Sequence, residues 1–392
     1  MLLVLSLPRD VRPRLAHRRA VHGEPVPAEG PDRVRREARP TARTAAPASR
    51  AGARRQYVLP VDIVAIGAAL GLALVLGISS APNAASALIA SRAAVWRVAL
   101  GYSFVLHALG ALLGGTAVAL TIAGLVSVPA DEVATVYASG CIAAIAFGAV
   151  AARLGLPTSA THGLVGGLIG AGLASGGIHA INWGGLEGFR AVGALGVLLA
   201  LVLSPILGVA GGWVARRIAV RALSRGTRRL LGPVRGGIWL AAGAVALSDG
   251  TNDGQKAMGV AAAVLLATGR IDRFEVPLSV RAPVALVFAL GTVIGGGRLI
   301  RRVGRGYFRP TPVDSLASQT AAAAVILGSS AVGAPVSTTT VVTAAVVGVG
   351  ADRHPRHVRW AGVADTISAW VLTIPVCAVL AAVLVACASL VT

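Results

Sequence analysis

Residues 247–258 read Leu-Ser-Asp-Gly-Thr-Asn-Asp-Gly-Gln-Lys-Ala-Met, a strongly polar stretch between two long apolar segments. It holds two carboxylates, two side-chain amides and Lys256, the sole lysine of the chain. An ionisable side chain at bilayer depth costs at least about 2.5–3.5 kcal/mol, so such residues are rare inside membranes. A polar loop between two helices is the simpler interpretation. We favour a substrate or ion site held by a broken membrane helix, because the rest of the chain points to that class.

The composition is that of an integral membrane protein. The 392 residues are 55% hydrophobic and 13% charged, with a mean hydropathy of +0.75, whereas a soluble domain carries about 25% charged residues. The apolar stretches are continuous and about 20 residues long, as membrane helices require, and they do not alternate as barrel strands do. We therefore predict an all-α polytopic protein of the plasma membrane.

The net charge of +20 does not indicate a nucleic-acid partner. Residues 1–56 hold 13 arginines and five acids, which we interpret as a disordered tail or as the result of a start site assigned too early. The remaining charge lies mostly in short loops, as membrane topology requires. Cys141, Cys377 and Cys387 lie in apolar segments without metal-ligand spacing, and we expect small buried residues there.

Ten membrane-crossing segments are predicted after residue 57, and three of them contain a polar interruption. The first set runs near 61–92 (interrupted), 98–124, 132–152, 157–177 (interrupted) and 190–215. The second set runs near 237–267 (interrupted), 282–297, 313–331, 335–351 and 361–391.

The two sets resemble one another, which predicts an internal duplication. Gly77–Asn83 aligns with Gly250–Lys256, and Gly155–His162 aligns with Gly333–Thr340. An Ala-Leu-Gly anchor at 108–110 recurs at 289–291, in the same order along the chain. The predicted units are a first transmembrane repeat (57–215), a basic cytoplasmic loop (216–236) and a second transmembrane repeat (237–392).

Loop charges predict that the two repeats have opposite orientations. Residues 216–235 and 298–309 hold seven and five arginines and no acid, whereas the loop at 129–132 is acidic. With the basic loops inside, each half crosses the membrane five times, and an odd number inverts the second half relative to the first. The arginine-rich tail and the mixed-charge loop at 270–281 fit this topology poorly.

The first pair of interrupted segments, Gly77–Asn83 and Gly250–Lys256, predicts a cation site. Pro82 removes a backbone donor and is expected to break its helix. Freed carbonyls, with Asn252 and Asp253, supply hard oxygen ligands for Na⁺, and Asp253 is alternatively a proton carrier. The lysine of the second segment neutralises an acid or faces an anion. A purely structural pair between that lysine and Asp253 is the competing interpretation.

The second pair, residues 157–162 and 335–340, predicts an oxyanion site. Pro157 and Pro335 each stand where a first helical turn is expected, a position that favours proline. Free N–H groups at a helix start, the helix dipole and neutral hydroxyl donors together suit an oxyanion. Hydroxyls that only bond back to helix carbonyls are the competing interpretation. The candidate ligands are Ser159, Thr161, Ser337, Thr338 and Thr339.

Two histidines are weaker candidates. His162 follows the first hydroxyl run and is a candidate proton carrier, although Thr340 takes its place in the second half. His107 stands alone in an apolar segment, and we expect it to be a hydrogen-bonded core residue.

At these motifs the chain resembles the Pit-type inorganic phosphate transporter family. That family carries a Gly-Ser-Asn-Asp-Val-Gln-Lys-like motif in its second half and Pro-Val-Ser-Thr-Thr-His in both halves. Residues 250–256, Gly-Thr-Asn-Asp-Gly-Gln-Lys, and residues 335–339, Pro-Val-Ser-Thr-Thr, are close matches. Residues 369–375 are similar to the family's last helix. The resemblance covers about residues 61–392.

The resemblance implies an inverted-repeat fold, often dimeric, that moves phosphate with Na⁺ or H⁺. By position, Asn252 and Asp253 would serve the cation, with Ser79 and Ser80 in place of the family's first Asn-Asp pair. The five hydroxyl residues above would serve phosphate. The remaining residues that would line the site are Asn83, Gln255 and Lys256. Asp249 stands where a histidine is usual and is a candidate to compensate in charge.

We therefore predict a secondary active transporter that takes up inorganic phosphate with Na⁺ or H⁺ by alternating access, without a cofactor, and as a homodimer. A Na⁺ site would lie at Asn252 and Asp253. One alternative is a sulfate or other oxyanion permease, disfavoured because Asp253 suits a protonated anion. Another is a degenerate non-transporting membrane component, motivated by the pair Ser79 and Ser80. An enzyme is not predicted, because no catalytic arrangement stands out.

Overall fold

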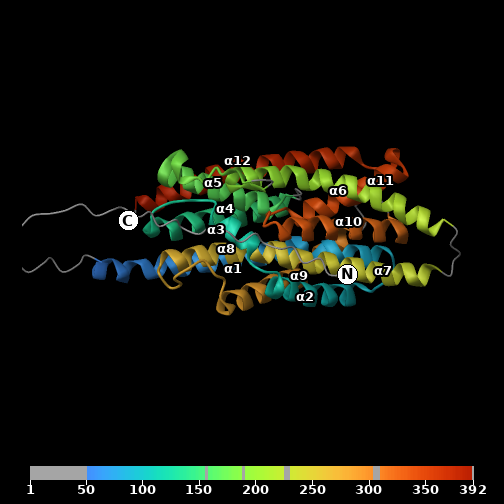
Figure 1. Cartoon of the computed structure of the whole chain (residues 1–392), viewed down its shortest axis with the longest axis horizontal. Helices are drawn as coiled ribbons and strands as arrows, with labels where there is room; N and C mark the ends of the chain where they lie inside the picture. The colour runs from blue at the N-terminus through green and yellow to red at the C-terminus, as the bar shows by residue number, and fades with distance from the viewer. Residues whose placement is uncertain (1–50, 155–157, 188–189, 225–229, 303–309, 391–392) are drawn as a thin grey trace, which may run out of the picture. The chain divides into compact units, whose positions relative to one another are not determined.

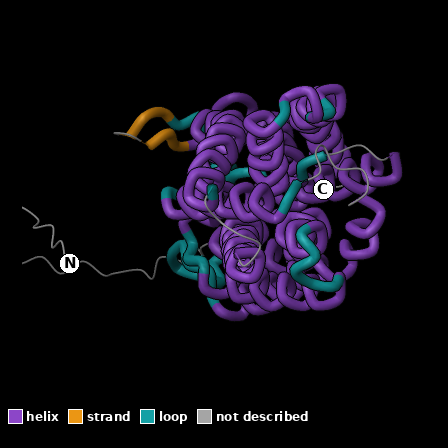
Figure 2. The backbone as a smooth tube through the Cα atoms, turned by 90° about the vertical axis from the view of Figure 1, so that its right-hand side faces the viewer, coloured by secondary structure: helices purple, strands orange, loops and turns teal. Residues whose placement is uncertain are grey.

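The chain folds into a bundle of membrane-length helices. The computed structural model describes residues 51–154, 158–187, 190–224, 230–302 and 310–390. Figure 1 shows the helices of this part lying along a common direction, and Figure 2 shows them nearly end-on. Most of the predicted tail, residues 1–50, lies outside the described residues, whereas residues 51–56 belong to the first helix.

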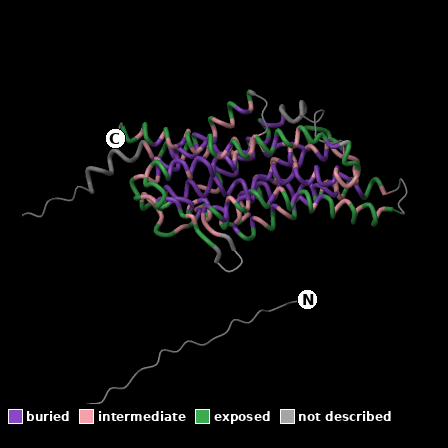
Figure 3. The backbone as a smooth tube through the Cα atoms, turned by 90° about the horizontal axis from the view of Figure 1, so that it is seen from above, coloured by how far each residue is buried: buried purple, intermediate pink, exposed green. Residues whose placement is uncertain are grey.

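Helices dominate because a chain in lipid must satisfy its backbone hydrogen bonds within each segment. Buried residues fill the interior of the bundle, and exposed residues follow its outer faces (Figure 3). The helices are α1 (Ala51–Ala90), α2 (Trp96–Leu113), α3 (Ala117–Ala123), α4 (Ala130–Leu154), α5 (Ala160–Gly176), α6 (Gly193–Leu223), α7 (Leu231–Asp249), α8 (Gln255–Ala267), α9 (Leu278–Arg302), α10 (Pro312–Ala331), α11 (Thr338–Arg353) and α12 (Trp360–Ser389).

Eight helical stretches within the described residues are long and apolar enough to cross a membrane. All ten predicted segments contain helix, but α10 and α11 are not among the eight. These two helices pack against each other and are joined by a turn at residues 332–337. The structure therefore describes a multi-pass membrane protein in which α10 and α11 form a helical hairpin.

The predicted break at Pro82 is wrong, because α1 continues through that residue. Proline removes only one helical hydrogen bond, and tight packing against α9 supports the helix on both sides of the loss. A Cβ on Gly77 would lie 1.9 Å from the carbonyl oxygen of Phe288, and one on Gly295 would lie 2.5 Å from that of Ile78. The matching segment of the second half is distorted but not broken, because a π-helical turn at Gly250–Gly254 joins α7 to α8 within one helical stretch, Leu231–Ala267.

Glycines bring helices of the two halves into backbone contact, as is common in membrane proteins. Gly77 of α1 meets Phe288 of α9, and Gly250 of the π-turn meets the carbonyl oxygen of His107 on α2, where a Cβ would lie at 2.2 Å. Further contacts of the same kind are Gly110 with Leu247, Gly291 with Leu74, Gly170 with Ala378, and Gly348 with Val209.

Two other parts of the chain differ from the prediction. The basic segment at 216–236 is largely helical, because α6 extends to Leu223 and α7 begins at Leu231. The fold is also not purely helical, since β1 (Gly185–Glu187) and β2 (Arg190–Val192) form a small antiparallel hairpin. This hairpin lies in the connection between α5 and α6, outside the paired motifs of the sequence.

Candidate anion site

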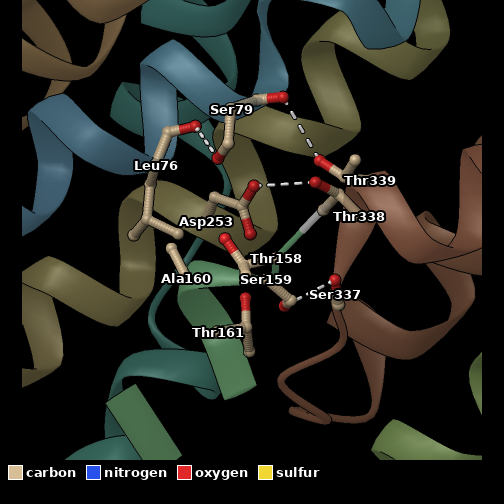
Figure 4. A pocket seen from close by; sticks show the side chains of 10 residues that line it. All are labelled: Leu76, Ser79, Thr158, Ser159, Ala160, Thr161, Asp253, Ser337, Thr338 and Thr339. Carbon is tan, nitrogen blue, oxygen red and sulfur yellow. Dashed lines mark hydrogen bonds between the residues drawn. The ribbon is translucent and has the colours of Figure 1, made fainter. Parts of the chain in front are cut away.

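A polar pocket lies where four helices from both halves of the sequence meet (Figure 4). About 200 Å³ among its lining residues, a volume that includes open solvent, is not filled by protein atoms. Its walls come from α1, the start of α5, the π-turn before α8, and the start of α11. The lining residues are Leu76, Ser79, Thr158, Ser159, Ala160, Thr161, Asp253, Ser337, Thr338 and Thr339.

The first turns of α5 and α11 meet in this pocket. Ser159 precedes α5 in an extended conformation, and its hydroxyl accepts a bond from the His162 amide at 3.3 Å. Ser337 stands in the same position before α11 and makes no side-chain cap bond. The Ser159 Oγ donates to the Ser337 Oγ at 2.9 Å. Helix starts carry free N–H groups and the positive end of the dipole, so the pocket favours an anion.

Pro335 does not lie in the first turn of α11, contrary to the prediction. Helix α11 begins at Thr338, three residues after Pro335. Pro157 lies outside the described residues, and α5 begins at Ala160. Pro335 instead lies within the α10–α11 turn, and Ser337, two residues later, takes the N-cap position of α11, which hydroxyl side chains favour.

Asp253 and Lys256 form a buried pair beside the hydroxyl groups. The lysine ammonium contacts the Asp253 carboxylate and donates to the Thr161 Oγ1 at 2.9 Å and to the Val336 carbonyl at 2.5 Å. The other carboxylate oxygen accepts from Ser80 at 2.9 Å and from Thr338 at 2.8 Å. Asp253 lines the pocket, whereas Lys256 lies behind this lining and reaches it through its bonds to Asp253 and Thr161. The ion pair expected from the sequence is therefore present beside the pocket.

Two predicted site residues lie in hydrogen-bonded positions away from the pocket lining. The Asn252 amide donates to Ser330 at 2.9 Å and to the Ala334 carbonyl at 3.2 Å, and its oxygen accepts from the Val336 N–H. It thus holds the α10–α11 turn. Gln255 accepts from the Val118 N–H at 2.8 Å and donates to the Gly114 carbonyl at 2.7 Å. Its side chain thus connects the end of α2 to the start of α3.

Asn83 borders the pocket without lining it. Its amide donates to the Thr338 Oγ1 at 3.3 Å and to the Asp249 Oδ2 at 2.8 Å. Thr158 lines the pocket but was not among the predicted ligands, although its place in the first hydroxyl run was a usable signal. The Thr339 hydroxyl donates to the Ser79 carbonyl at 3.3 Å (Figure 4). Its proton is therefore used, and its oxygen remains as a hydrogen-bond acceptor toward the pocket.

The predicted Na⁺ ligands do not offer a free set of oxygens in this structure. Both Asp253 oxygens already accept hydrogen bonds, one of them from the Lys256 ammonium. The Asn252 oxygen accepts from a backbone N–H. Hard cations such as Na⁺ bind oxygen ligands, and a neighbouring ammonium repels them. A cation at these side chains would share their oxygens with the present donors and would lie beside the Lys256 ammonium, so the arrangement described disfavours Na⁺ there.

The fold and the pocket together define a class of protein. Helix starts and a distorted helix from two halves of the sequence converge on one buried polar site within a multi-pass bundle. This is the arrangement of a membrane transporter, in which interrupted or distorted helices surround a substrate site inside the bundle.

Comparison with known proteins gives the family. The model of the phosphate transporter family matches residues 76–381, and the chain belongs to this family. It is 35% identical over 320 residues to a Mycobacterium bovis protein named "Probable low-affinity inorganic phosphate transporter", covering 80% of this chain and 74% of that one. A Rhizobium meliloti protein of the same name is 31% identical, covering 82% of this chain and 95% of that one.

A solved structure shares the fold. The chain matches "The sodium-dependent phosphate transporter" with a TM-score of 0.72 at 23% identity, over 85% of this chain and 100% of that one. The predicted family resemblance is confirmed, and the family is one of transporters and not of enzymes.

Proposed function

We propose that this protein takes up inorganic phosphate across the plasma membrane as a secondary active transporter, coupled to a cation gradient and working by alternating access. The observation that carries the proposal is the contact between Ser159 and Ser337, 2.9 Å apart. It joins the starts of α5 and α11, so one anion in the pocket is held by both halves at once. The relatives named as phosphate transporters support phosphate as the anion.

Exchanged contacts between the halves support an inverted repeat. Gly77 and Gly250 occupy equivalent positions in the alignment, and so do their partners Phe288 and His107. Each glycine thus contacts a residue of the opposite half, and the two contacts are equivalent, as in two units related by a two-fold axis. Equivalent residues also meet each other, since Ser80 bonds Asp253 and Ser159 bonds Ser337. Five crossings in each half would place this axis in the membrane plane.

The pocket chemistry suits an anion that must bind and leave. Hydroxyls of Ser159, Thr161 and Ser337 and the first-turn amides supply neutral donors, which hold an oxyanion without a large desolvated charge. Lys256 supplies the one ammonium, and its contact with Asp253 offsets its charge when the pocket is empty. An anion that displaces part of this contact gains the ammonium as a donor.

Phosphate is favoured over sulfate by the carboxylate in the wall. Asp253 lines the pocket, and a carboxylate accepts a hydrogen bond from a protonated oxyanion but repels an acceptor-only one. Sulfate carries no proton at neutral pH, so it cannot make this bond.

The test is uptake of labelled phosphate by vesicles that contain the purified full chain. We expect saturable uptake that excess sulfate leaves largely intact, and loss of that uptake in Ser337→Ala. Ser329→Ala is the matched control, because its hydroxyl only bonds back to the Val325 carbonyl in the same hairpin. Full competition by sulfate would change the substrate to that anion. Absence of uptake in the wild type would indicate a non-transporting component.

A further inference from the structure

A second buried polar cluster lies beside the pocket, formed by His107 of α2 and Asp249 at the end of α7. Both side chains are 0% exposed, and His107 Nε2 lies 3.6 Å from Asp249 Oδ2. His107 Nδ1 lies 2.7 Å from the Thr292 Oγ1, which fixes the ring. Asp249 Oδ1 and His107 Nε2 have no hydrogen-bond partner within the described residues. Burying two ionisable side chains costs free energy, and such residues inside membranes are usually functional.

Asn83 connects this cluster to the pocket. Its amide nitrogen donates to Asp249 at 2.8 Å and to the pocket hydroxyl of Thr338 at 3.3 Å. Thr338 in turn donates to Asp253 at 2.8 Å. A continuous chain of three hydrogen bonds therefore runs from Asp249 to the pocket carboxylate, and a change of charge at one end is felt at the other.

The charges of the core balance only if the cluster holds a proton. Lys256 contacts Asp253, so these two charges offset each other. Asp249 has the uncharged amide of Asn83 and the imidazole of His107 as its neighbours, so one proton shared by His107 and Asp249 makes the pair neutral as a unit. A second proton, giving an imidazolium beside a neutral carboxyl, adds one positive charge, which offsets an anion in the pocket.

We propose that His107 and Asp249 form a proton-binding site that fills when the pocket takes up its anion, which makes H⁺ the coupling ion. This inference rests on the proposed function. One proton passes from water on the outer side to the pair as the anion enters, and the same proton leaves to water on the inner side with the anion. No bond other than those to the proton forms or breaks.

The surroundings supply few competing charges. In the described part of the chain, Asp253 and Lys256 are the other ionised groups that act on Asp249. The neighbouring helices present neutral groups there, with Asn83 on α1, Thr292 on α9 and, through its bond to the Asn83 carbonyl, Gln319 on α10. The Phe288 ring packs edge-on against His107 with ring centroids 5.2 Å apart and shields it.

The experiment uses the full chain in sodium-free vesicles with the membrane potential clamped at zero. Exchange of labelled for unlabelled phosphate at equal pH on both sides tests the proposed function alone. Accumulation of phosphate is then measured against an imposed pH gradient, acid outside. One coupled proton contributes about tenfold in accumulation per pH unit, since a tenfold concentration ratio is worth about 1.4 kcal/mol.

We expect Asp249→Asn and His107→Gln each to lose that tenfold factor per pH unit when accumulation is normalised to exchange. Comparison at the same pH values cancels the protonation of phosphate itself. Asp62→Asn is the matched control, because Asp62 is a buried carboxylate of α1 outside the pocket lining, and it should keep the wild-type slope. Equal slopes in the wild type and both variants, with exchange intact, would overturn the proton site and leave phosphate transport standing.

A measurement without substitution guards against variants that do not fold. Phosphate binding to the detergent-solubilised wild type is followed by calorimetry in buffers of different ionisation enthalpy, at a pH where free phosphate is mostly the dianion. Net proton uptake is expected on binding. Binding without proton uptake would overturn the inference, as would accumulation driven by Na⁺ and indifferent to the pH gradient.

Discussion

Replacing Lys256 by methionine tests whether the buried pair organises the site. The side chain is fully buried, and its ammonium contacts Asp253, Thr161 and the Val336 carbonyl. Methionine fills a similar volume without the charge, so the change leaves Asp253 ionised and unpaired. Breaking a buried ion pair by removing one partner costs about 3–5 kcal/mol, or roughly 100- to 5,000-fold in the unfolding equilibrium.

The assay is unfolding of the purified chain in mixed micelles, with stability read from a linear denaturant titration. Asp253→Asn is measured alongside, and so is the double variant Asp253→Asn/Lys256→Met. The double variant leaves neither charge unpaired, so we expect it to be more stable than the sum of the single effects predicts, by about 1–3 kcal/mol. All three variants should lose coupled phosphate uptake.

The control is Arg235→Met, which removes the same charge from an exposed position on α7. A change at such a surface position is expected to stay within about 0.5 kcal/mol. If Lys256→Met is as mild as this control, or if the two single effects simply add, the pair does not hold the site together. Near-normal uptake in Asp253→Asn would remove that carboxylate from the mechanism.

Three further changes probe the packing, the pocket and the helix ends. Gly250→Ala places a Cβ 2.2 Å from the His107 carbonyl oxygen and should lower stability by about 1–3 kcal/mol in a thermal unfolding assay. Gly67→Ala is the control and should leave stability unchanged, because a Cβ there meets nothing within 4 Å. Equal melting temperatures for the two variants would contradict the close approach. Ser159→Ala and Ser337→Ala should weaken phosphate binding less than additively when combined, by about 0.5–3 kcal/mol in a calorimetric double-mutant cycle, because each loses the same 2.9 Å bond; strict additivity would separate the two hydroxyls. Asp314→Asn should destabilise the fold by about 3–5 kcal/mol in the same micelle titration, because Asp314 is buried and accepts from Arg216 at 3.0 Å and Arg353 at 2.7 Å; the exposed Asp272→Asn is its control, and equal effects would refute the buried network.

Several features of the site could be predicted because they depend on local chemistry. Long apolar stretches require membrane helices, since only a helix satisfies its own backbone in lipid. A hydroxyl run next to a proline indicates a helix start, and two such starts at matching positions of two similar halves predict that Ser159 and Ser337 meet. The pair between Asp253 and Lys256 also follows from their spacing of three residues on a helix.

Other features could not be predicted because they depend on the neighbouring helices. Asn252 and Asp253 are adjacent in the sequence, yet only Asp253 lines the pocket, because the π-turn and the α10–α11 turn together set which side chain faces inward. The helix through Pro82 continues because α9 packs closely against it, a contact with residues more than 200 positions away. The sequence predicted His107 to be an isolated core histidine, because its ionisable partner Asp249 belongs to the other half of the chain.

The order of residues along the chain was sufficient to predict a multi-pass membrane protein with two kinds of polar motif, because hydrophobic length and helix-start chemistry act within a few residues. The tertiary structure alone decided which of those polar groups share a cavity. Contacts between the two halves are fixed by glycine-mediated packing of helices. The direction in which a side chain points after that packing cannot be predicted from the spacing of residues in the sequence.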